Sequence, residues 1–178
     1  MGVYRFEKLR VLVVDDSPHM RKILTTILDA FGCRNVLEAT DGHMALQRVR
    51  ETLPDILIAD LWMPGMDGLE LTRQIRSGAD SPCPYLPIIM LTGHTDLDTV
   101  KSARDAGINE FLVKPISPTA LLKRIQVVIE QPRPFVRTKT YFGPDRRRLK
   151  RDVYQGPERR EKDAELTSGP AIKKAVKG

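Results

Sequence analysis

Residues 9–18 read Leu-Arg-Val-Leu-Val-Val-Asp-Asp-Ser-Pro. The β-branched apolar run predicts a buried strand, and the Ser-Pro pair predicts a helix start with serine as N-cap and proline at the first helical position. Apolar residues at helical spacing continue from there to Gly32, which is typical of a residue that ends a helix. The stretch therefore predicts a strand–helix unit with two acids, Asp15 and Asp16, at the carboxyl end of the strand.

The same unit recurs up to about residue 130. Further strands are predicted at 36–39, 54–60, 88–91 and 110–113, and helices at 42–51, 68–76, 96–106 and 118–129. Strands that are apolar without alternation indicate a parallel sheet covered on both faces. We therefore predict an α/β fold, a (βα)5 doubly wound parallel five-stranded sheet. In such a fold, ligands bind outside the carboxyl ends of the strands.

Charge divides the chain into two parts. Residues 1–130 hold 15 basic and 17 acidic side chains, a net charge of −2, whereas residues 131–178 hold 14 and 6, a net charge of +8. We predict one domain over residues 1–130, followed by a linker and an arginine-rich tail over residues 131–178. Because large aliphatic residues are scarce in this tail, we expect it to be disordered until it binds a partner, with residues 166–178 as a basic end of no assigned role.

Composition excludes several classes of protein. No apolar run approaches the roughly 20 residues that a membrane span needs, and we expect neither membrane insertion nor a signal peptide. The two cysteines, Cys33 and Cys83, are too few for a disulfide framework or a metal cluster. We therefore expect a cytoplasmic protein with reduced thiols.

Five polar side chains end or follow the predicted strands. They are Asp15, Asp16, Asp60, Thr92 and Lys114. Three carboxylates at one sheet edge would repel one another unless a hard cation lay among them, and oxygen ligands with room for water suit Mg²⁺. Beside such an ion one carboxylate becomes a candidate nucleophile toward a phosphoryl group. The lysine and the threonine could then bind the phosphoryl oxygens.

Four motifs in this part of the chain resemble the receiver domain of bacterial two-component response regulators. They are Val13-Val-Asp-Asp16, Asp60-Leu-Trp-Met-Pro-Gly-Met-Asp-Gly68, Leu91-Thr92 and Val113-Lys-Pro115. The resemblance covers about residues 8–130 and implies a flavodoxin-like fold in which Asp60 is the phospho-acceptor. It implies Mg²⁺ ligands and phosphoryl ligands as follows: Asp15, Asp16, Asp60 and the backbone carbonyl of Trp62 for the metal, and Thr92 and Lys114 for the phosphoryl group.

The same resemblance implies two further features. The peptide bond before Pro115 would be cis, which positions Lys114. Phe111 falls at the aromatic switch position of the family, although plain core packing explains a phenylalanine there equally well.

The basic tail contains one motif twice. Residues 141–147 and 154–160 both read Tyr-x-Gly-Pro-[Asp/Glu]-Arg-Arg, at an offset of 13 residues. Arginine can bind guanine O6 and N7 or a phosphate, and tyrosine offers a stacking face. A carboxylate can accept hydrogen bonds from the guanine N1–H and N2–H groups. Because two half-sites match a two-fold symmetric ligand, the repeat favours a guanine dinucleotide such as cyclic di-GMP.

A receiver followed by this tail resembles the CheY-like cyclic di-GMP effectors, the Cle proteins of alphaproteobacteria. The resemblance implies that the tail folds around an intercalated dimer of cyclic di-GMP. It also implies that the liganded protein goes to the flagellar motor switch or a polar protein and affects motility and surface attachment. The nucleotide-binding residues carried over are Tyr141, Gly143, Asp145, Arg146, Arg147, Tyr154, Gly156, Glu158, Arg159 and Arg160.

We expect a signalling adaptor, not an enzyme, with a histidine kinase or phosphotransferase as a further partner. Two other roles stay open for the tail. It could bind DNA through phosphates, with a steep salt dependence, although an acid at the same place in both copies fits that role poorly. It could also be inert, which would leave a single-domain regulator controlled by phosphorylation alone.

Overall fold

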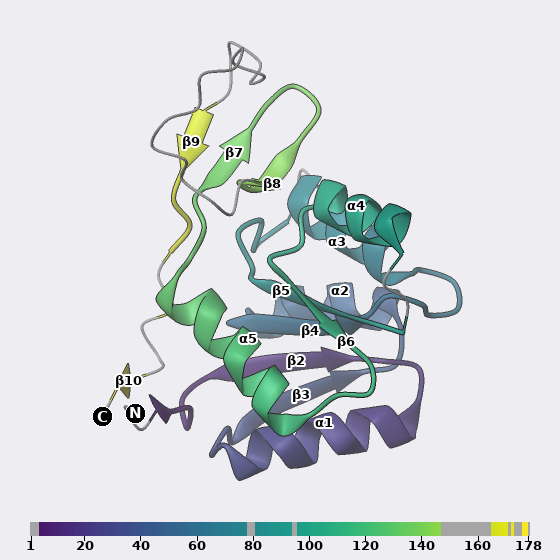
Figure 1. Ribbon diagram of the computed structural model, residues 1–178, viewed down its shortest axis with the longest axis vertical. Coiled ribbons are helices and arrows are strands. Elements are labelled where there is room, and N and C mark those ends of the chain that lie inside the picture. The colour runs from purple at the N-terminus through teal and green to yellow at the C-terminus, as the bar shows by residue number, and fades with distance from the viewer. Residues whose placement is uncertain are drawn as a thin grey trace.

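A five-stranded parallel sheet in the order β3-β2-β4-β5-β6 forms the centre of the computed structural model (Figure 1). The structure describes residues 4–77, 81–93, 96–146, 165–170, 172 and 176–177. The strands are β2 (Arg10–Val14), β3 (Asn35–Ala39), β4 (Ile56–Asp60), β5 (Ile88–Thr92) and β6 (Glu110–Val113). Every neighbouring pair in this sheet is parallel, so the predicted doubly wound fold is confirmed.

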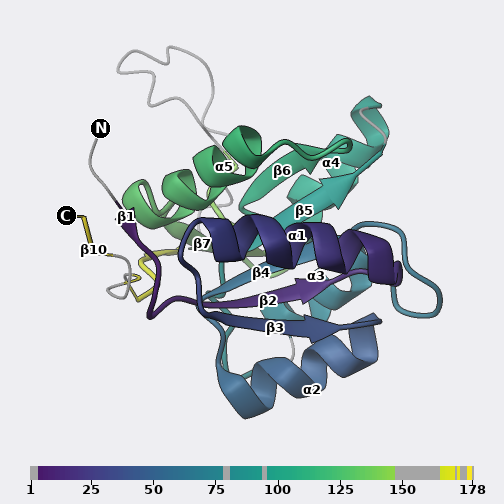
Figure 2. The ribbon, with the colours of Figure 1, turned by 90° about the horizontal axis from the view of Figure 1, so that it is seen from below.

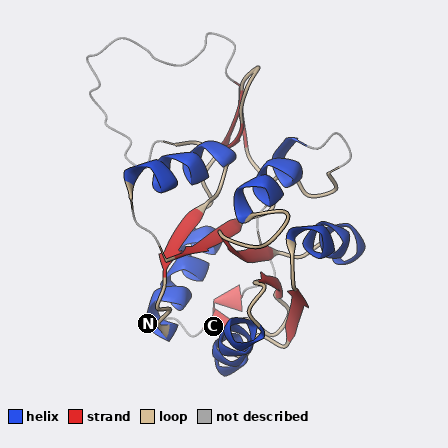
Figure 3. Cartoon of the chain, turned by 90° about the vertical axis from the view of Figure 1, so that its right-hand side faces the viewer, coloured by secondary structure: helices blue, strands red, loops and turns tan. Residues whose placement is uncertain are grey.

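In the described part of the chain, five helices flank the parallel sheet, and Figures 1 and 2 show them on both of its faces. They are α1 (Pro18–Ala30), α2 (Gly42–Thr52), α3 (Gly68–Ser77), α4 (Leu97–Ala106) and α5 (Pro118–Glu130). Apolar residues of α1 and α5 pack with one set of strand residues, and those of α2, α3 and α4 pack with the other set. The side view places helices around the central strands (Figure 3).

Strand β2 shows why its sequence is apolar without alternation. Leu12 and Val14 pack in the core on the α2, α3 and α4 side, whereas Val11 and Val13 pack in the core on the α1 and α5 side. All four side chains are fully buried. Successive residues of a strand point to opposite faces, so a strand covered on both faces must be apolar at every position.

The start and end of α1 also match the sequence prediction. The Ser17 side chain accepts a hydrogen bond from the Met20 N–H at 3.3 Å, and Pro18 opens the helix. Gly32 follows the helix with a φ of 82°, a left-handed conformation that glycine adopts without steric cost.

The chain beyond α5 differs from the prediction of a disordered tail. Strands β7 (Phe135–Arg137) and β8 (Phe142–Pro144) form an antiparallel hairpin, and β9 (Glu165–Thr167) pairs with the other edge of β7. A short antiparallel pair joins β1 (Tyr4–Arg5) to β10 (Val176–Lys177). The predictions of disorder over residues 131–178 and of an unstructured end over residues 166–178 are therefore wrong for these segments.

Aromatic residues account for this difference. Phe135 is only 3% exposed, and its ring lies 4.9 Å from that of Tyr85 and 5.4 Å from that of Phe142, between ring centroids. Tyr85 and Phe142 also meet edge to face at 5.2 Å. Further along the tail, Ile172 packs against the core of α1 and α5. Buried aromatic side chains supply apolar area that a count of aliphatic residues misses.

Residues 147–164 lie outside the described residues. They include Arg147 and the whole second copy of the repeat, with Tyr154, Gly156, Glu158, Arg159 and Arg160. Within the described part of the chain, no helix combines the length and the apolar character that crossing a membrane requires.

Candidate functional site

Three acids meet at the carboxyl edge of the parallel sheet. Asp15 and Asp16 follow β2, and Asp60 ends β4, its neighbour in the sheet. Each offers one carboxylate oxygen, and these oxygens lie within 4.8 Å of one another. Asp15 and Asp60 are buried whereas Asp16 is exposed. One side of the cluster is therefore open to an ion or a substrate from solvent.

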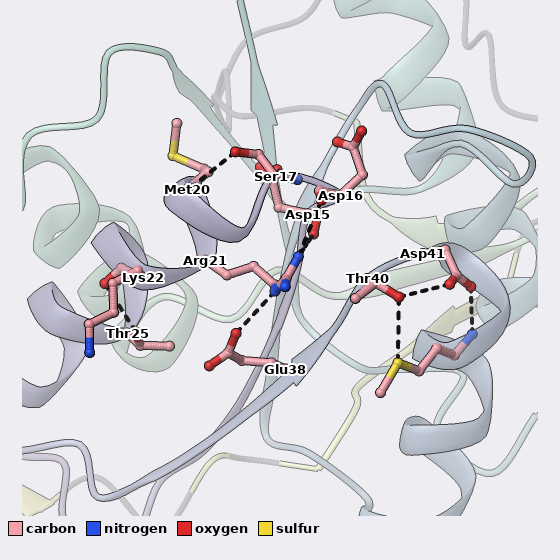
Figure 4. A network of polar contacts seen from close by, with 11 residues as sticks. Asp15, Asp16, Ser17, Met20, Arg21, Lys22, Thr25, Glu38, Thr40 and Asp41 are labelled. Atoms are coloured by element: carbon pink, nitrogen blue, oxygen red, sulfur yellow. Dashed lines mark hydrogen bonds and ion pairs between the residues drawn. The ribbon is translucent and has the colours of Figure 1, made fainter.

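A backbone N–H and an arginine side chain at the start of α1 fix the loop that carries Asp15 and Asp16. The Ser17 N–H donates to Asp15 Oδ1 at 2.9 Å. Arg21 donates to the Asp15 carbonyl at 2.8 Å and to the Asp16 carbonyl at 3.3 Å, and it forms an ion pair with Glu38 at 3.0 Å (Figure 4). The loop after β2 is thus held by a residue that the sequence analysis did not single out.

Lys114 joins the two buried acids. Its Nζ lies 2.9 Å from Asp60 Oδ1 and 3.2 Å from Asp15 Oδ2. The Lys114 N–H donates to the Thr92 carbonyl at 2.8 Å, and the Lys114–Pro115 peptide bond is cis. The cis peptide is the one that the resemblance implies, and the lysine lies where it can contact a group bound to Asp60.

The electrostatics of the site follow from burial and from this lysine. Burial raises the pKa of the Asp60 carboxyl, and the nearby Asp15 adds to this, although the hydrogen bond and charge of Lys114 oppose it. Burial of the Lys114 ammonium by itself lowers the pKa of this lysine. The neighbouring carboxylates of Asp60 and Asp15 have the larger combined effect, so the pKa of Lys114 is raised. The Lys114 side chain therefore stays protonated and positively charged at neutral pH.

The remaining receiver residues are placed as follows. Thr92 is fully buried at the end of β5, beside β4 and β6 in the sheet. Trp62 is 58% exposed. Phe111 is half-buried and packs against the core on the α2, α3 and α4 side. Both its switch role and the Trp62 ligand stay predictions.

Gly68 is a positioning residue whose role the structure explains. A Cβ at Gly68 would lie 2.4 Å from the Asp60 carbonyl oxygen and 2.7 Å from Met90 Sδ. The start of α3 therefore lies directly against the end of β4, and no larger residue fits there. The sequence signal for this role is a glycine at the start of the predicted helix 68–76, within the Asp60–Gly68 motif that resembles receiver domains.

The described tail residues lie at the opposite edge of the sheet. Tyr141, Gly143, Asp145 and Arg146 belong to the β7–β8 hairpin and the residues that follow it. Arg146 stacks on the Tyr141 ring, with 4.0 Å between the guanidinium carbon and the ring centroid, and it pairs with Asp105 at 3.3 Å. Asp105 lies near the end of α4, just before β6 begins, so this site is remote from the acids at the carboxyl ends of the strands.

Comparison with known proteins identifies the domain. The family model of the response regulator receiver domain matches residues 11–126. The chain belongs to the response regulator receiver family. The chemotaxis protein CheY of Pseudomonas aeruginosa is 36% identical over 123 residues, which are 69% of this chain and 98% of that protein. CheY1 of Helicobacter pylori is 38% identical over 122 residues, or 68% of this chain and 97% of that protein.

Solved structures agree with this assignment. Chemotaxis protein CheY4 of Vibrio cholerae is 34% identical to this receiver, with a TM-score of 0.62 over 67% of this chain and 98% of that one. The receiver domain of NtrX from Brucella abortus is 30% identical, with a TM-score of 0.61 over 68% of this chain and 98% of that one. The family model ends at residue 126, before the tail hairpin begins.

Receiver domains bind Mg²⁺ at this acidic edge, and those of the CheY type are signalling proteins that act with histidine kinases and motor switch proteins. The residues of this chain suit that ion. The cluster offers three hard carboxylate oxygens, and the exposure of Asp16 leaves room for the waters that Mg²⁺ keeps.

Proposed function

We propose that this chain is a receiver in which Asp60 accepts a phosphoryl group and whose tail adds cyclic di-GMP as a second input. The observation that carries the first part is the placement of Asp60 Oδ1 2.9 Å from Lys114 Nζ, with Asp15 and Asp16 in the same cluster. The donor would be a phosphohistidine of a kinase or phosphotransferase, or a small acyl phosphate.

The hydrogen bonds of Asp60 indicate which of its oxygens reacts. Both described donors, the Lys114 ammonium and the Leu61 N–H at 2.9 Å, lie on Oδ1. Oδ2 is therefore the oxygen that we assign as nucleophile. The Oδ2–phosphorus bond would form as the bond from phosphorus to the donor nitrogen or oxygen breaks, and the electron pair of that bond leaves with the donor.

Two side chains of the site can then bind the transferred group. Lys114 can turn a hydrogen bond from the carboxylates toward a phosphoryl oxygen, and the Thr92 hydroxyl at the end of β5 can donate another. When bound, Mg²⁺ would neutralise the charge of the phosphoryl oxygens. Asp15, Asp16 and Asp60 would hold it, with the Trp62 carbonyl as the further ligand that the resemblance implies.

Peptide mapping tests the phosphoryl site. We expect the full chain, incubated with acetyl phosphate and Mg²⁺, to carry a phosphoryl group on Asp60 after borohydride trapping of the acyl phosphate. Chelation of the metal with EDTA should suppress the modification, because the charge of three acids then opposes an incoming anion. Modification at a residue other than Asp60 would overturn the assignment.

The second part of the proposal rests on the duplicated motif of the tail. In the described part of the first copy, residues 141–146, the Tyr141 ring and the exposed Arg146 guanidinium already lie face to face at 4.0 Å. An aromatic face and a guanidinium in one place suit a guanine base and its phosphate. We propose that the two copies together bind an intercalated cyclic di-GMP dimer and that the liganded protein docks to a motor switch or polar protein to control motility and attachment.

Calorimetry of cyclic di-GMP tests this part. Replacing Arg147 and Arg160 with Ala together should abolish binding to the full chain, because each copy loses a bidentate donor to guanine or phosphate. The matched control is Arg50→Ala with Arg73→Ala, which removes the same charge from α2 and α3 and should preserve affinity. A stoichiometry of one nucleotide dimer per chain would support the intercalated form.

The same titration separates the other roles of the tail. Unchanged affinity in the Arg147/Arg160 double variant would contradict the proposed nucleotide site. Another outcome is a wild-type chain that shows no binding of cyclic di-GMP and binds duplex DNA, with an affinity that falls steeply from a low to a high salt concentration. That result would make the tail a DNA-binding segment. Binding to neither ligand would leave a receiver controlled by phosphorylation alone.

A further inference from the structure

The tail hairpin holds the end of α4 that lies farthest from the acidic site. Arg146 pairs with Asp105 in the last turn of the helix at 3.3 Å. Arg133 donates to the carbonyl oxygens of Ile108 and Asn109, in the loop that follows the helix. The carboxyl end of a helix carries partial negative charge, so both guanidinium groups stabilise this end of α4.

The hairpin also contacts the carboxyl end of α4 through its backbone, at a shorter distance than contacts between side chains would allow. A Cβ at Gly143 would lie 3.0 Å from Gly107 Cα and 2.6 Å from Tyr141 Oη. A Cβ at Gly107 would lie 3.3 Å from the Phe142 carbonyl oxygen, and Gly107 caps α4 in the left-handed region at φ 101°. The two glycines therefore let the hairpin and the end of α4 approach backbone to backbone.

The described fixed residues of the first repeat copy, which end at Arg146, take part in this docked arrangement. Tyr141 Oη donates to the Pro144 carbonyl at 2.8 Å, and its ring lies under Arg146. The Asp145 N–H donates to the Pro134 carbonyl at 2.7 Å, and the Asp145 carbonyl accepts from Arg133 at 3.1 Å. Residues that we assign to a nucleotide are thus engaged with the receiver and with one another.

We infer that the first repeat copy is a clamp on the carboxyl end of α4, and that cyclic di-GMP binding must release it. This inference rests on the proposed nucleotide function. In the docked arrangement one face of the Arg146 guanidinium lies on the Tyr141 ring and its Nη1 pairs with Asp105. A guanine base that stacks on Tyr141 and a phosphate that takes the Arg146 fork would displace both contacts. The docked and nucleotide-bound arrangements are therefore alternative states of the same side chains.

The clamp connects the two ends of the receiver through one helix. Helix α4 begins at Leu97, shortly after Thr92 of the phosphoryl site, and it ends at Asp105 and Ala106 beside the hairpin. A ligand that binds only the released hairpin shifts the position or the stability of α4, and the coupling is reciprocal. Nucleotide binding to the tail would thus act on the helix that follows strand β5, the strand that ends at Thr92.

Hydrogen exchange of the full chain tests the clamp without nucleotide. The N–H groups of Gly107 and Ile108 both donate to the Ala103 carbonyl, so their exchange reports on the end of α4. Arg146→Ala should speed their exchange about two- to fivefold, the range that an exposed ion pair allows. Arg50→Ala is the control with the same loss of charge. Equal exchange rates in the wild type and in Arg146→Ala would overturn the clamp.

Calorimetry of cyclic di-GMP tests the release. Asp105→Asn removes the competing carboxylate and should raise affinity about two- to fivefold. Asp98→Asn, with the same change of charge at the other end of α4, should leave affinity as in the wild type. An equal gain in affinity for cyclic di-GMP in both variants, or no gain in either, would contradict the proposal that Asp105 competes with the nucleotide for Arg146. Wild-type chain that binds no cyclic di-GMP would overturn the proposed nucleotide function and the release together, and the exchange result would still decide whether the clamp exists.

Discussion

Replacing Asp60 with Asn is expected to abolish formation of the acyl phosphate. The amide oxygen of asparagine is neutral and its nitrogen lone pair is delocalised, so neither atom attacks phosphorus as a carboxylate does. Lys114 keeps a partner in this variant, because Asp15 Oδ2 lies 3.2 Å from its ammonium. The fold should therefore survive while the reaction is lost. Mass spectrometry of the intact chain after treatment with acetyl phosphate and Mg²⁺ measures the loss.

A second aspartate in the same loop provides the control. Asp67 follows Asp60 in the chain, and its side chain accepts the Glu70 N–H at 2.8 Å at the start of α3. Asparagine caps helices as well as aspartate does, so Asp67→Asn should keep both the fold and full modification. Persistent modification of Asp60→Asn at the wild-type rate would contradict the assignment of Asp60 as phospho-acceptor.

The same Asp60→Asn variant should be more stable than the wild type at neutral pH in metal-free buffer. Burial raises the pKa of this carboxyl above its ordinary value of 3.8, so the folded state binds the proton more tightly than the unfolded state does. Its ionisation therefore costs stability as pH rises from 3.8 through the folded pKa, and asparagine removes that cost. Urea unfolding should show the gain at neutral pH and its disappearance below pH 3.8.

Much of the receiver was predictable because its signals are local. The apolar run ending at Val14, the cap at Ser17 and the glycine after α1 each act within a few residues, and they place the strand and the helix correctly. The topology rule for parallel sheets then brings strand ends together, which is how the acids from β2 and β4 could be grouped.

The tail was not predictable in the same way because its stabilising contacts are long-range. Tyr85 lies between α3 and β5, yet it meets Phe135 and Phe142 beyond α5. Composition averaged over the tail gives no sign of such a cluster. The sequence contains no signal for the ion pair between Arg146 and Asp105 either. Each residue taken alone has the pattern of an ordinary charged side chain at the surface.

A buried arginine shows how closely the hairpin belongs to the receiver. Arg76 of α3 is only 4% exposed and donates to the Gly107 carbonyl at 2.9 Å, the Pro84 carbonyl at 2.8 Å and Asn109 Oδ1 at 3.0 Å. Burial lowers the pKa of its guanidinium to about 9. The Phe135 ring covers it from the tail side, 5.1 Å from the guanidinium carbon, where a cation–π contact offsets part of the lost hydration.

Among the described residues of the tail, Phe135→Ala is accordingly expected to give the largest loss of stability. Removal of a buried phenylalanine ring costs about 3–5 kcal/mol when the surroundings cannot collapse. Here the ring also packs edge to face with Tyr85 and covers the Arg76 cation. Urea unfolding of the full chain measures the loss, and Leu166→Ala in β9 is the control, because that side chain is 53% exposed and its truncation should cost little.

Limited trypsin cleavage after Lys139 shows whether the β7–β8 hairpin of the Phe135→Ala variant stays docked on the receiver or detaches. Lys139 lies exposed between β7 and β8, so cleavage there speeds up when the hairpin leaves the receiver. Faster cleavage together with a loss below about 3 kcal/mol would mean that the hairpin detaches as a unit, since detachment limits the cost of the cavity. A docked, uncleaved hairpin should show the full loss. Unchanged stability and unchanged cleavage would contradict the packing of Phe135 altogether, because a ring that anchors the tail to Arg76 cannot be removed without either effect.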